Sequence, residues 1–167
     1  MKNLDAQKQI EYLENCTARE KIKAAENREI LPEVADYLVD CEMDEKFKES
    51  LYQTLFFRYD TNIWASTIAK VARRTEKISV LYDIAQNQNT DIETLKYLMG
   101  LGKPFVNYGL ACNKKLPIEM LDSIADEADE DDTSIALAIL RNDNVTEEIK
   151  AKVLKKYENH MWFRNKR

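Results

Sequence analysis

Glycine and proline are scarce in this chain, with three of each among 167 residues. Folds built from short strands need frequent turns, and turns draw heavily on these two residues. The scarcity therefore excludes most strand-rich architectures and favours helices. Apolar residues make up 44% of the chain, which is enough to build one buried core. We expect an all-α fold.

Histidine and cysteine are also rare. The single histidine, His160, cannot supply a metal site with several histidines, and no Ser or Cys motif accompanies it to form a catalytic triad. Cys16, Cys41 and Cys112 stand singly without C-x-x-C spacing, a pattern typical of reduced thiols rather than of a disulfide framework. We predict a protein that is not an enzyme and that has no metal and no cofactor.

Long apolar runs and excess positive charge are missing too. No run approaches the ~18 apolar residues that span a bilayer, and residues 1–9 are polar, unlike a signal peptide. The sequence thus predicts a cytoplasmic protein without membrane contact. The formal net charge is −5, with 25 Lys and Arg against 30 Asp and Glu. Because phosphate groups are held by clustered Lys and Arg, we do not expect direct binding of nucleic acid.

A short pattern recurs along the chain. An aliphatic residue and Ala precede Asn87 and Asn113, a Glu follows each Asn after six residues, and an aliphatic residue follows after eleven. Further copies surround Asn27 and Asn142, and we place Arg58 at the same position in a degraded second copy. These five positions, the anchors, are separated by 31, 29, 26 and 29 residues. Such spacing is typical of one helix pair per copy.

Repeated helix pairs bury their apolar faces by stacking on one another. We therefore predict a right-handed α-α superhelix, a HEAT-like solenoid of about five helix pairs, over residues 17–158. A capping helix within residues 1–16 and a basic tail at residues 159–167 complete one domain. At each anchor we expect Asn to adopt the left-handed conformation that ends a helix, with its amide bonded to backbone groups of the turn.

The pattern resembles a known repeat family. The copy from Leu110 to Ala125 reads aliphatic, Ala, x, Asn and continues with Pro117, Glu119, Leu121 and Ile124. This unit is similar to the variant leucine-rich repeat, a relative in shape of HEAT and armadillo repeats, and the similarity extends from about Ala24 to Leu154. Arg28, Gln88, Lys114 and Asp143 stand where that family usually has Pro. The resemblance implies a curved superhelix that binds other macromolecules and carries no catalytic residues.

The second helix of each pair should expose one strip of side chains. If the residues seven or eight, eleven and twelve positions after each anchor face the core, those at six, nine, ten and thirteen face solvent. Aromatic residues lie among carboxylates on this strip, a composition that suits a protein partner with a basic surface. Trp64 and Ile68 have an alternative place beneath a neighbouring helix. The predicted partner-binding residues are Tyr37, Trp64, Ile68, Glu93, Tyr97, Glu119, Asp122, Asp126, Asp129 and Asp131.

Two other functions compete with this protein-binding hypothesis. Eight acidic residues and no Lys or Arg lie between Glu119 and Asp132, a run that is usually a solvated loop. The run could also mimic a phosphate backbone, as in a small acidic inhibitor that counteracts a toxin, nuclease or defence protein by blocking its nucleic-acid groove. A more remote alternative is a relative of the HEAT-like DNA glycosylases, suggested by Trp64 and Asp60. The sequence indicates neither the partner's identity nor an oligomeric state.

Overall fold

The computed structural model describes residues 4–27, 29–57, 63–129 and 132–160. Over these ranges the chain forms eleven helices and no strand, which confirms the all-α prediction. The chain divides into two compact units, Met1–Asp91 and Ile92–Arg167. The predicted anchor Arg58 and the predicted contact residue Asp131 lie outside the described residues.

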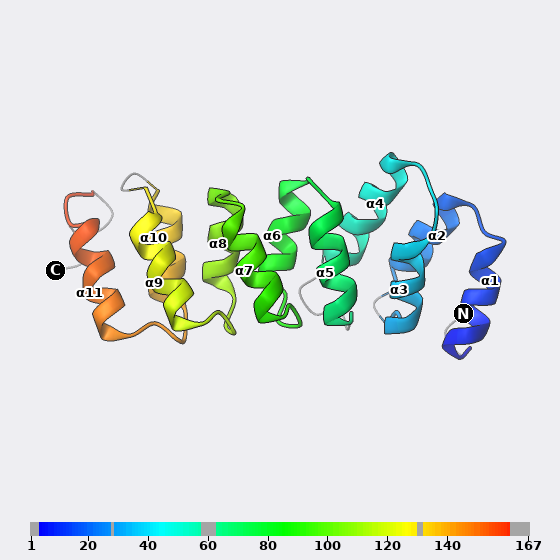
Figure 1. Ribbon diagram of the computed structural model, residues 1–167, viewed down its shortest axis with the longest axis horizontal. Helices are drawn as coiled ribbons and strands as arrows, with labels where there is room; N and C mark the ends of the chain where they lie inside the picture. Colours follow the sequence, from blue (N-terminus) through cyan, green and yellow to red (C-terminus); the bar gives the residue numbers. More distant parts are fainter. Residues whose placement is uncertain (1–3, 28, 58–62, 130–131, 161–167) are drawn as a thin grey trace. The chain divides into compact units, whose positions relative to one another are not determined.

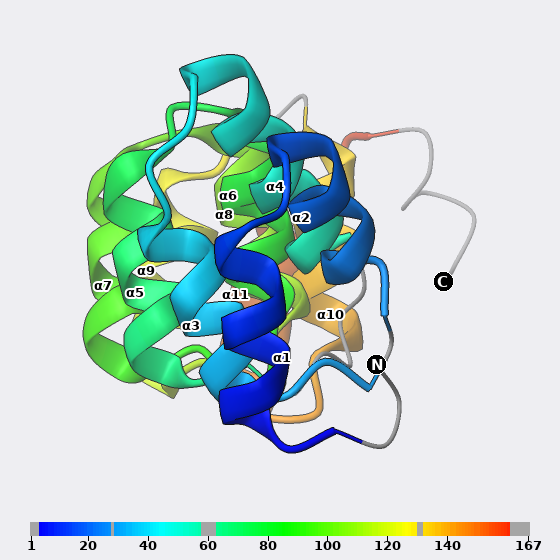
Figure 2. The same cartoon turned by 90° about the vertical axis from the view of Figure 1, so that its right-hand side faces the viewer.

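Unit 1 is a two-layered stack of antiparallel helices (Figure 1). One layer contains α2, α4 and α6, in which α4 packs against both of the others; the second contains α1, α3 and α5, in which α3 packs against both of the others (Figure 2). The helices are α1 (Ala6–Glu14), α2 (Ala18–Ala25), α3 (Pro32–Asp40), α4 (Glu45–Phe56), α5 (Ala65–Arg74) and α6 (Ile78–Gln86).

Unit 2 repeats this arrangement. Its helices are α7 (Ile92–Gly100), α8 (Pro104–Cys112), α9 (Ile118–Glu127), α10 (Thr133–Arg141) and α11 (Glu147–Lys156). Here α8 packs against α10, α9 packs against α11, and α7 packs against α8. The turn between α7 and α8 needs Gly102, whose φ of 59° lies in the region that side chains with a Cβ rarely adopt. Pro104 then supplies the first residue of α8.

The four anchor asparagines form the same turn between the two helices of a pair. The side-chain Oδ1 of Asn27, Asn87, Asn113 and Asn142 accepts a hydrogen bond from the backbone N–H two residues later, at 2.8–3.2 Å. The backbone N–H of each Asn donates to the carbonyl three residues earlier, and its own carbonyl accepts from the N–H three residues later. Each side chain thus satisfies backbone groups that the end of a helix leaves without partners.

The expected left-handed conformation at these anchors is wrong. The φ angles are −66° at Asn87, −79° at Asn113 and −71° at Asn142, all with extended ψ. No described residue other than glycine has a positive φ. Asn is therefore used for the acceptor on its short side chain, and not for its tolerance of left-handed backbone.

Asn142 also joins neighbouring helix pairs. Its Nδ2 donates to the carbonyl oxygens of Ala111 at 2.8 Å, in the last turn of α8, and of Asn113 at 3.0 Å, the anchor of the preceding pair. Asn144 adds a bond from its Nδ2 to the carbonyl of Lys114 at 2.6 Å. Within unit 2, consecutive turns are thus bonded side chain to backbone, and their spacing is fixed by an amide with an exposure of only 6%.

The second copy of the repeat carries two additional residues between its helices. In the second helices α3, α9 and α11, buried residues lie seven and eleven positions after the anchor: Val34 and Leu38, Met120 and Ile124, Ile149 and Val153. The corresponding buried residues of α5 are Thr67 and Val71, each two residues later than an anchor at position 58 would put them. The first helix α4 agrees instead with an anchor at position 58, because its buried Leu55 and Phe56 correspond to the buried Ile84 and Ala85 before Asn87.

The register of α5 is therefore shifted by two residues from the one that the predicted anchor at Arg58 implies, while Arg58 itself lies outside the described residues. Periodicity alone did not decide the register of α5, since its sequence carries small and apolar residues on more than one face. Packing selects the face with Thr67, Ile68, Val71 and Ala72, each 0% exposed. The consequence is that the strip predicted to face solvent is displaced in this one helix.

Replacement of Asn142 by alanine should destabilise the fold more than replacement of any exposed amide. The change removes one acceptor and leaves the carbonyls of Ala111 and Asn113 without their donor, so we expect the free energy of unfolding to fall by about 2–4 kcal/mol. Chemical denaturation checks this value. The matched control is Asn15→Ala, an exposed residue at the end of α1, and an equal effect of the two substitutions would contradict the proposed role of Asn142.

Candidate functional site

The predicted strip of partner-binding residues is only partly exposed. Ile68 is 0% exposed and belongs to the core of unit 1, so its prediction as a contact residue is wrong for the reason of register given above. Trp64 is the N-cap residue of α5 and is 43% exposed. Of the two residues whose place the sequence left open, one is therefore in the core and the other at the surface.

Tyr37 on α3 lies near the end of α1. Burial, a hydrogen bond with the side chain of Cys41 and the nearby acidic groups of Glu14 and Cys16 raise the pKa of Tyr37 to about 12. The ammonium group of Lys21 lies 5.9 Å from the centre of its ring. Tyr37 is thus half-buried among side chains of its own unit. Tyr97 on α7 is half-buried as well. Neither tyrosine presents a freely exposed ring.

Asp36 and Asp40 of α3 are held by the neighbouring helix α5. Lys70 bridges the two carboxylates, at 3.0 Å from Asp36 and 2.6 Å from Asp40. Arg74 pairs with Asp40 at 2.9 Å and donates to the backbone carbonyl of Val39 at 3.1 Å. The hydrogen bond from Lys70 is the main cause that lowers the pKa of Asp40. We call this arrangement a carboxylate clasp.

Unit 2 contains a second carboxylate clasp with the same construction. Lys152 of α11 bridges Asp122 and Asp126 of α9, at 2.5 and 2.7 Å. Lys156, one turn further on, donates to the carbonyl oxygens of Ala125 and Asp126 at 3.0 and 2.7 Å. These cations lie at the C-terminal end of α9, where the helix dipole also favours positive charge. Asp122 and Asp126 are thus paired within the unit, although the sequence predicted both as partner-binding residues.

Glu93 and Glu119 remain exposed, as predicted, in the first turns of α7 and α9. The residue before each is an exposed isoleucine: Ile92 is 50% exposed and Ile118 45%. Both helices run antiparallel to α8, so their N-terminal ends lie on the same side of unit 2 (Figure 1). We call these four residues the Ile-Glu surface. The sequence did not indicate these isoleucines as surface residues, because an isoleucine within the repeat suggests a core position. Each is the first residue of its helix, however, and therefore projects into solvent.

The acidic run is divided between structural and exposed residues. Asp126 belongs to the second clasp, and Asp132 caps α10 by accepting from the backbone N–H of Ser134 at 3.0 Å. Glu127 and Asp129 are exposed. Two of the four acids described between residues 126 and 132 therefore stabilise the unit itself.

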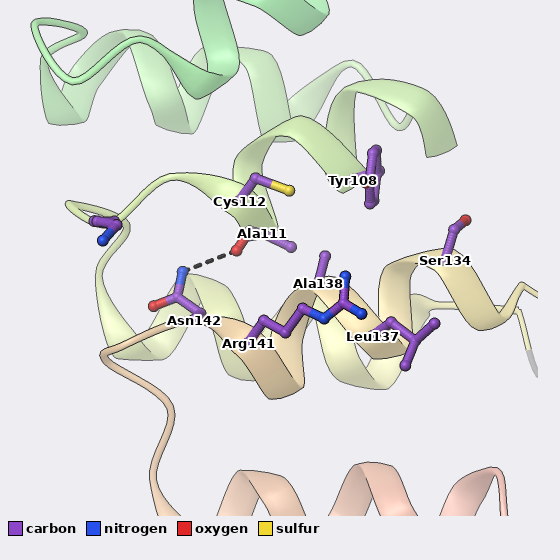
Figure 3. A pocket seen from close by; sticks show the side chains of 9 residues that line it. Tyr108, Ala111, Cys112, Ser134, Leu137, Ala138, Arg141 and Asn142 are labelled. Atoms are coloured by element: carbon purple, nitrogen blue, oxygen red, sulfur yellow. Dashed lines mark hydrogen bonds between the residues drawn. The ribbon is translucent and has the colours of Figure 1, made fainter. Parts of the chain in front are cut away.

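A cavity of about 260 Å³ opens between α8 and α10. Figure 3 shows Cys112 and Tyr108 on one wall and Ser134, Leu137 and Arg141 on the other, with Asn142 bonded to Ala111 at its end. Burial raises the pKa of the Cys112 thiol, although a hydrogen bond with Tyr108 and the positive charge of Arg141 act in the opposite direction. The thiol is consequently protonated and a weak nucleophile at neutral pH.

The three cysteines are free thiols, and each is half-buried. In the described ranges, no three His, Cys, Asp or Glu side chains are grouped so that they could hold a metal ion. The same part of the chain has no helix with the length and apolar composition that a bilayer crossing requires.

The first clasp should contribute to stability in a pH-dependent way. Lys70→Met removes the cation that bridges Asp36 and Asp40, and we expect the free energy of unfolding to fall by about 1 kcal/mol at neutral pH. Because the pKa of Asp40 lies below its ordinary value of 3.8 in the folded state, this contribution is fully present above 3.8 and is lost as the pH falls from there through the lower folded-state pKa. Denaturation of both proteins across the acidic range measures the difference. Lys77→Met, an exposed lysine of unit 1, is the control, and a difference that persists in strong acid would contradict the clasp.

Cys112 should react slowly with alkylating reagents. In a Cys16→Ser/Cys41→Ser background, the rate of reaction with iodoacetamide should rise with pH to a midpoint above the ordinary thiol value of 9.0, because burial disfavours the thiolate. Arg141→Met should move the midpoint further upward, since it removes a nearby positive charge. A midpoint below 9.0 in the parent protein would show that the cavity does not disfavour the thiolate.

No protein-family model, no curated protein and no solved structure matches this chain.

Proposed function

We propose that this chain is a non-enzymatic binding protein that recognises a partner protein with a basic surface. The observation that carries the proposal is the Ile-Glu surface, where an exposed isoleucine and an exposed glutamate recur in the first turns of two helices of unit 2, α7 and α9. As part of the same proposal, the helix pairs form a right-handed superhelix of the variant leucine-rich repeat or HEAT-like kind. The recurrence of one asparagine turn in four copies supports that repeat architecture.

The composition of the Ile-Glu surface indicates its partner. Exposed isoleucine gains free energy when it is covered, at roughly 25 cal/mol per Å² of apolar surface removed from water. Among the described residues, Glu93 is paired with Lys96 alone, at 2.9 Å, and the two side chains are 77% and 58% exposed. Such an exposed pair contributes little to stability, so Glu93 can exchange it for a basic group of a partner. Apolar contact with flanking carboxylates fits a partner whose basic residues surround an apolar patch.

The carboxylate clasps support this choice of surface by elimination. Asp36, Asp40, Asp122 and Asp126 already have cationic partners within their own units. A partner protein that used these acids would first have to displace Lys70 or Lys152. Glu93 would give up only its exposed pair with Lys96, and Glu119 has no ion pair among the described residues. The three free thiols fit a reducing compartment such as the cytoplasm, which is where we place the protein.

An inhibitor of a nucleic-acid-binding protein is the second candidate, and exposed Glu127 and Asp129 favour it. In that case the partner's nucleic-acid groove would be the basic surface. The two candidates differ in one measurement: an inhibitor competes with nucleic acid for the partner and abolishes the partner's activity, whereas a scaffold leaves both nucleic-acid binding and activity intact.

Charge reversal of the Ile-Glu surface should weaken partner binding. A tagged protein captures its partner from an extract of the native cell, and the Kd is then measured with both proteins purified. Glu93→Lys/Glu119→Lys should raise the Kd by about tenfold or more, because two attractive charges become repulsive. Glu26→Lys/Glu42→Lys makes the same change of net charge at exposed residues of unit 1 and should leave the Kd within about threefold.

A second variant separates the apolar contribution from the electrostatic one. Ile92→Ser/Ile118→Ser should raise the Kd while preserving its dependence on salt, since the glutamates remain. Equal Kd values for the parent protein, the charge reversal and the serine variant would contradict the proposed surface.

A further inference from the structure

The cavity between α8 and α10 is lined by positive charge, although the chain as a whole is acidic. The described residues that line it include the cations Lys114 and Arg141 and no Asp or Glu, whereas the chain has 30 acidic against 25 basic residues. The other lining residues are Tyr108, Ala111, Cys112, Ser134, Leu137, Ala138 and Asn142. The proposed partner-binding surface uses none of them.

Small side chains create the space in this cavity. Ala111 on α8 and Ala138 on α10 are 0% and 6% exposed and form its floor, so no large side chain fills the gap between the two helices. Leu137 and the ring of Tyr108, both half-buried, add apolar walls. Since a cavity of about 150 Å³ can hold benzene, one of about 260 Å³ has room for a small ring with a substituent.

Arg141 is the cation that an incoming molecule can reach without displacing another residue. Lys114 pairs with Asp143 at 2.9 Å, whereas Arg141 makes no ion pair with any residue in the described part of the chain. Arg141 is exposed, and Figure 3 shows its side chain lying along α10, with the guanidinium in the cavity on the side opposite Cys112 and Tyr108. Its N–H donors are therefore open to a ligand.

The remaining polar groups of the lining are already bonded within the unit. The hydroxyl of Tyr108 is hydrogen-bonded to the thiol of Cys112. The hydroxyl of Ser134 donates to the carboxylate of Asp132, which places a negative charge near that end of the cavity. Arg141 lies at the other end of α10. An anionic group of a ligand should therefore bind at the Arg141 end.

These features together select the kind of ligand. A guanidinium donates hydrogen bonds and accepts none, so its partner must be an acceptor with negative charge. The two oxygens of a carboxylate match its planar fork and form two parallel bonds. The apolar floor and walls gain free energy when an uncharged body covers them. A molecule with one carboxylate and a compact apolar body meets both requirements.

We infer that the cavity between α8 and α10 binds a small organic carboxylate, whose apolar body contacts Ala111, Leu137 and Ala138 and whose carboxylate pairs with Arg141. The Ile-Glu surface is built from α7 and α9, so the two sites share no residue. The inference goes beyond the proposed function and does not rest on it. It adds the binding of a small molecule to the recognition of a protein.

The thiol of Cys112 lines the cavity and can report its occupancy. In the Cys16→Ser/Cys41→Ser background, the rate of alkylation by iodoacetamide is measured with sodium benzoate up to about 10 mM, at constant ionic strength. We expect a saturable fall of at least about threefold, with a Kd on the order of 1 mM. The bound ring should cover the thiol, and the added negative charge should disfavour its thiolate.

Two probes separate charge from apolar contact. Benzamide has the shape of benzoate without its charge, and acetate has the carboxylate without the ring. Both should leave the alkylation rate nearly unchanged at concentrations where benzoate protects. Because the binding of benzoate needs both the ring and the charge, neither part alone should suffice.

Variants locate the binding. Arg141→Met should raise the Kd of benzoate at least about fivefold, whereas Lys115→Met removes an exposed cation outside the lining and should leave it unchanged. Rates with and without benzoate are compared within each variant, so the effect of Arg141 on the thiol itself cancels. Ala138→Leu fills the cavity and should abolish the protection. The NMR signal of the Arg141 Nε–H, which should shift with benzoate, is a measurement that does not depend on the thiol.

The outcomes are decisive in both directions. Benzoate protection that is lost in Arg141→Met and kept in Lys115→Met supports the site, whether or not a partner protein binds to the Ile-Glu surface. Absence of both protection and an Arg141 shift would overturn the inference. Protection by benzamide or acetate equal to that by benzoate, or an unchanged Kd in Arg141→Met, would overturn it as well.

Discussion

The hydrogen bond that the backbone N–H two residues after an asparagine donates to its side-chain oxygen is the constraint on which the remaining structure depends. It sets the angle at which the chain leaves one helix and enters the next, and therefore which residues of the second helix face the first. In unit 2 the same amide also bonds to the turn of the preceding pair through its nitrogen. One side chain thus links local geometry to the packing of neighbouring copies. The consistency of local and longer-range interactions is what makes such repeats fold to one arrangement.

Acidic residues on the second helices fall into two classes, and position within the helix separates them. Those in the middle and last turns face the next second helix and form clasps with its lysine or arginine. Those in the first turn project beyond the neighbouring helix, where solvent, the helix dipole and an exposed lysine of the same helix, such as Lys96 beside Glu93, act on them. The net negative charge of the chain is therefore a poor guide to its binding surface. What a partner can reach are the first-turn glutamates, the adjoining isoleucines and the acids beyond the end of α9.

The helical class and four of the five anchors could be predicted from the sequence, because scarcity of glycine and proline and a recurring asparagine are local signals. The register of α5 could not, since small residues on two faces leave periodicity undecided and only packing chooses between them. The ion pairs between helices could not be predicted from the sequence either, because Asp36 and Lys70 are far apart in sequence and no shared pattern links them.

The asparagine turns expose this protein to chemical ageing. Asparagine is among the residues that degrade on prolonged heating, by hydrolysis of the side-chain amide to a carboxylate. At Asn142 that single reaction would replace the nitrogen that donates to two carbonyl oxygens by a negatively charged oxygen that repels them. The oxygen that closes the local turn would survive, so the helix pair would keep its shape while its joint to the preceding pair opened. Hydrolysis of this one amide would thus weaken the contact between two consecutive helix pairs without unfolding either pair.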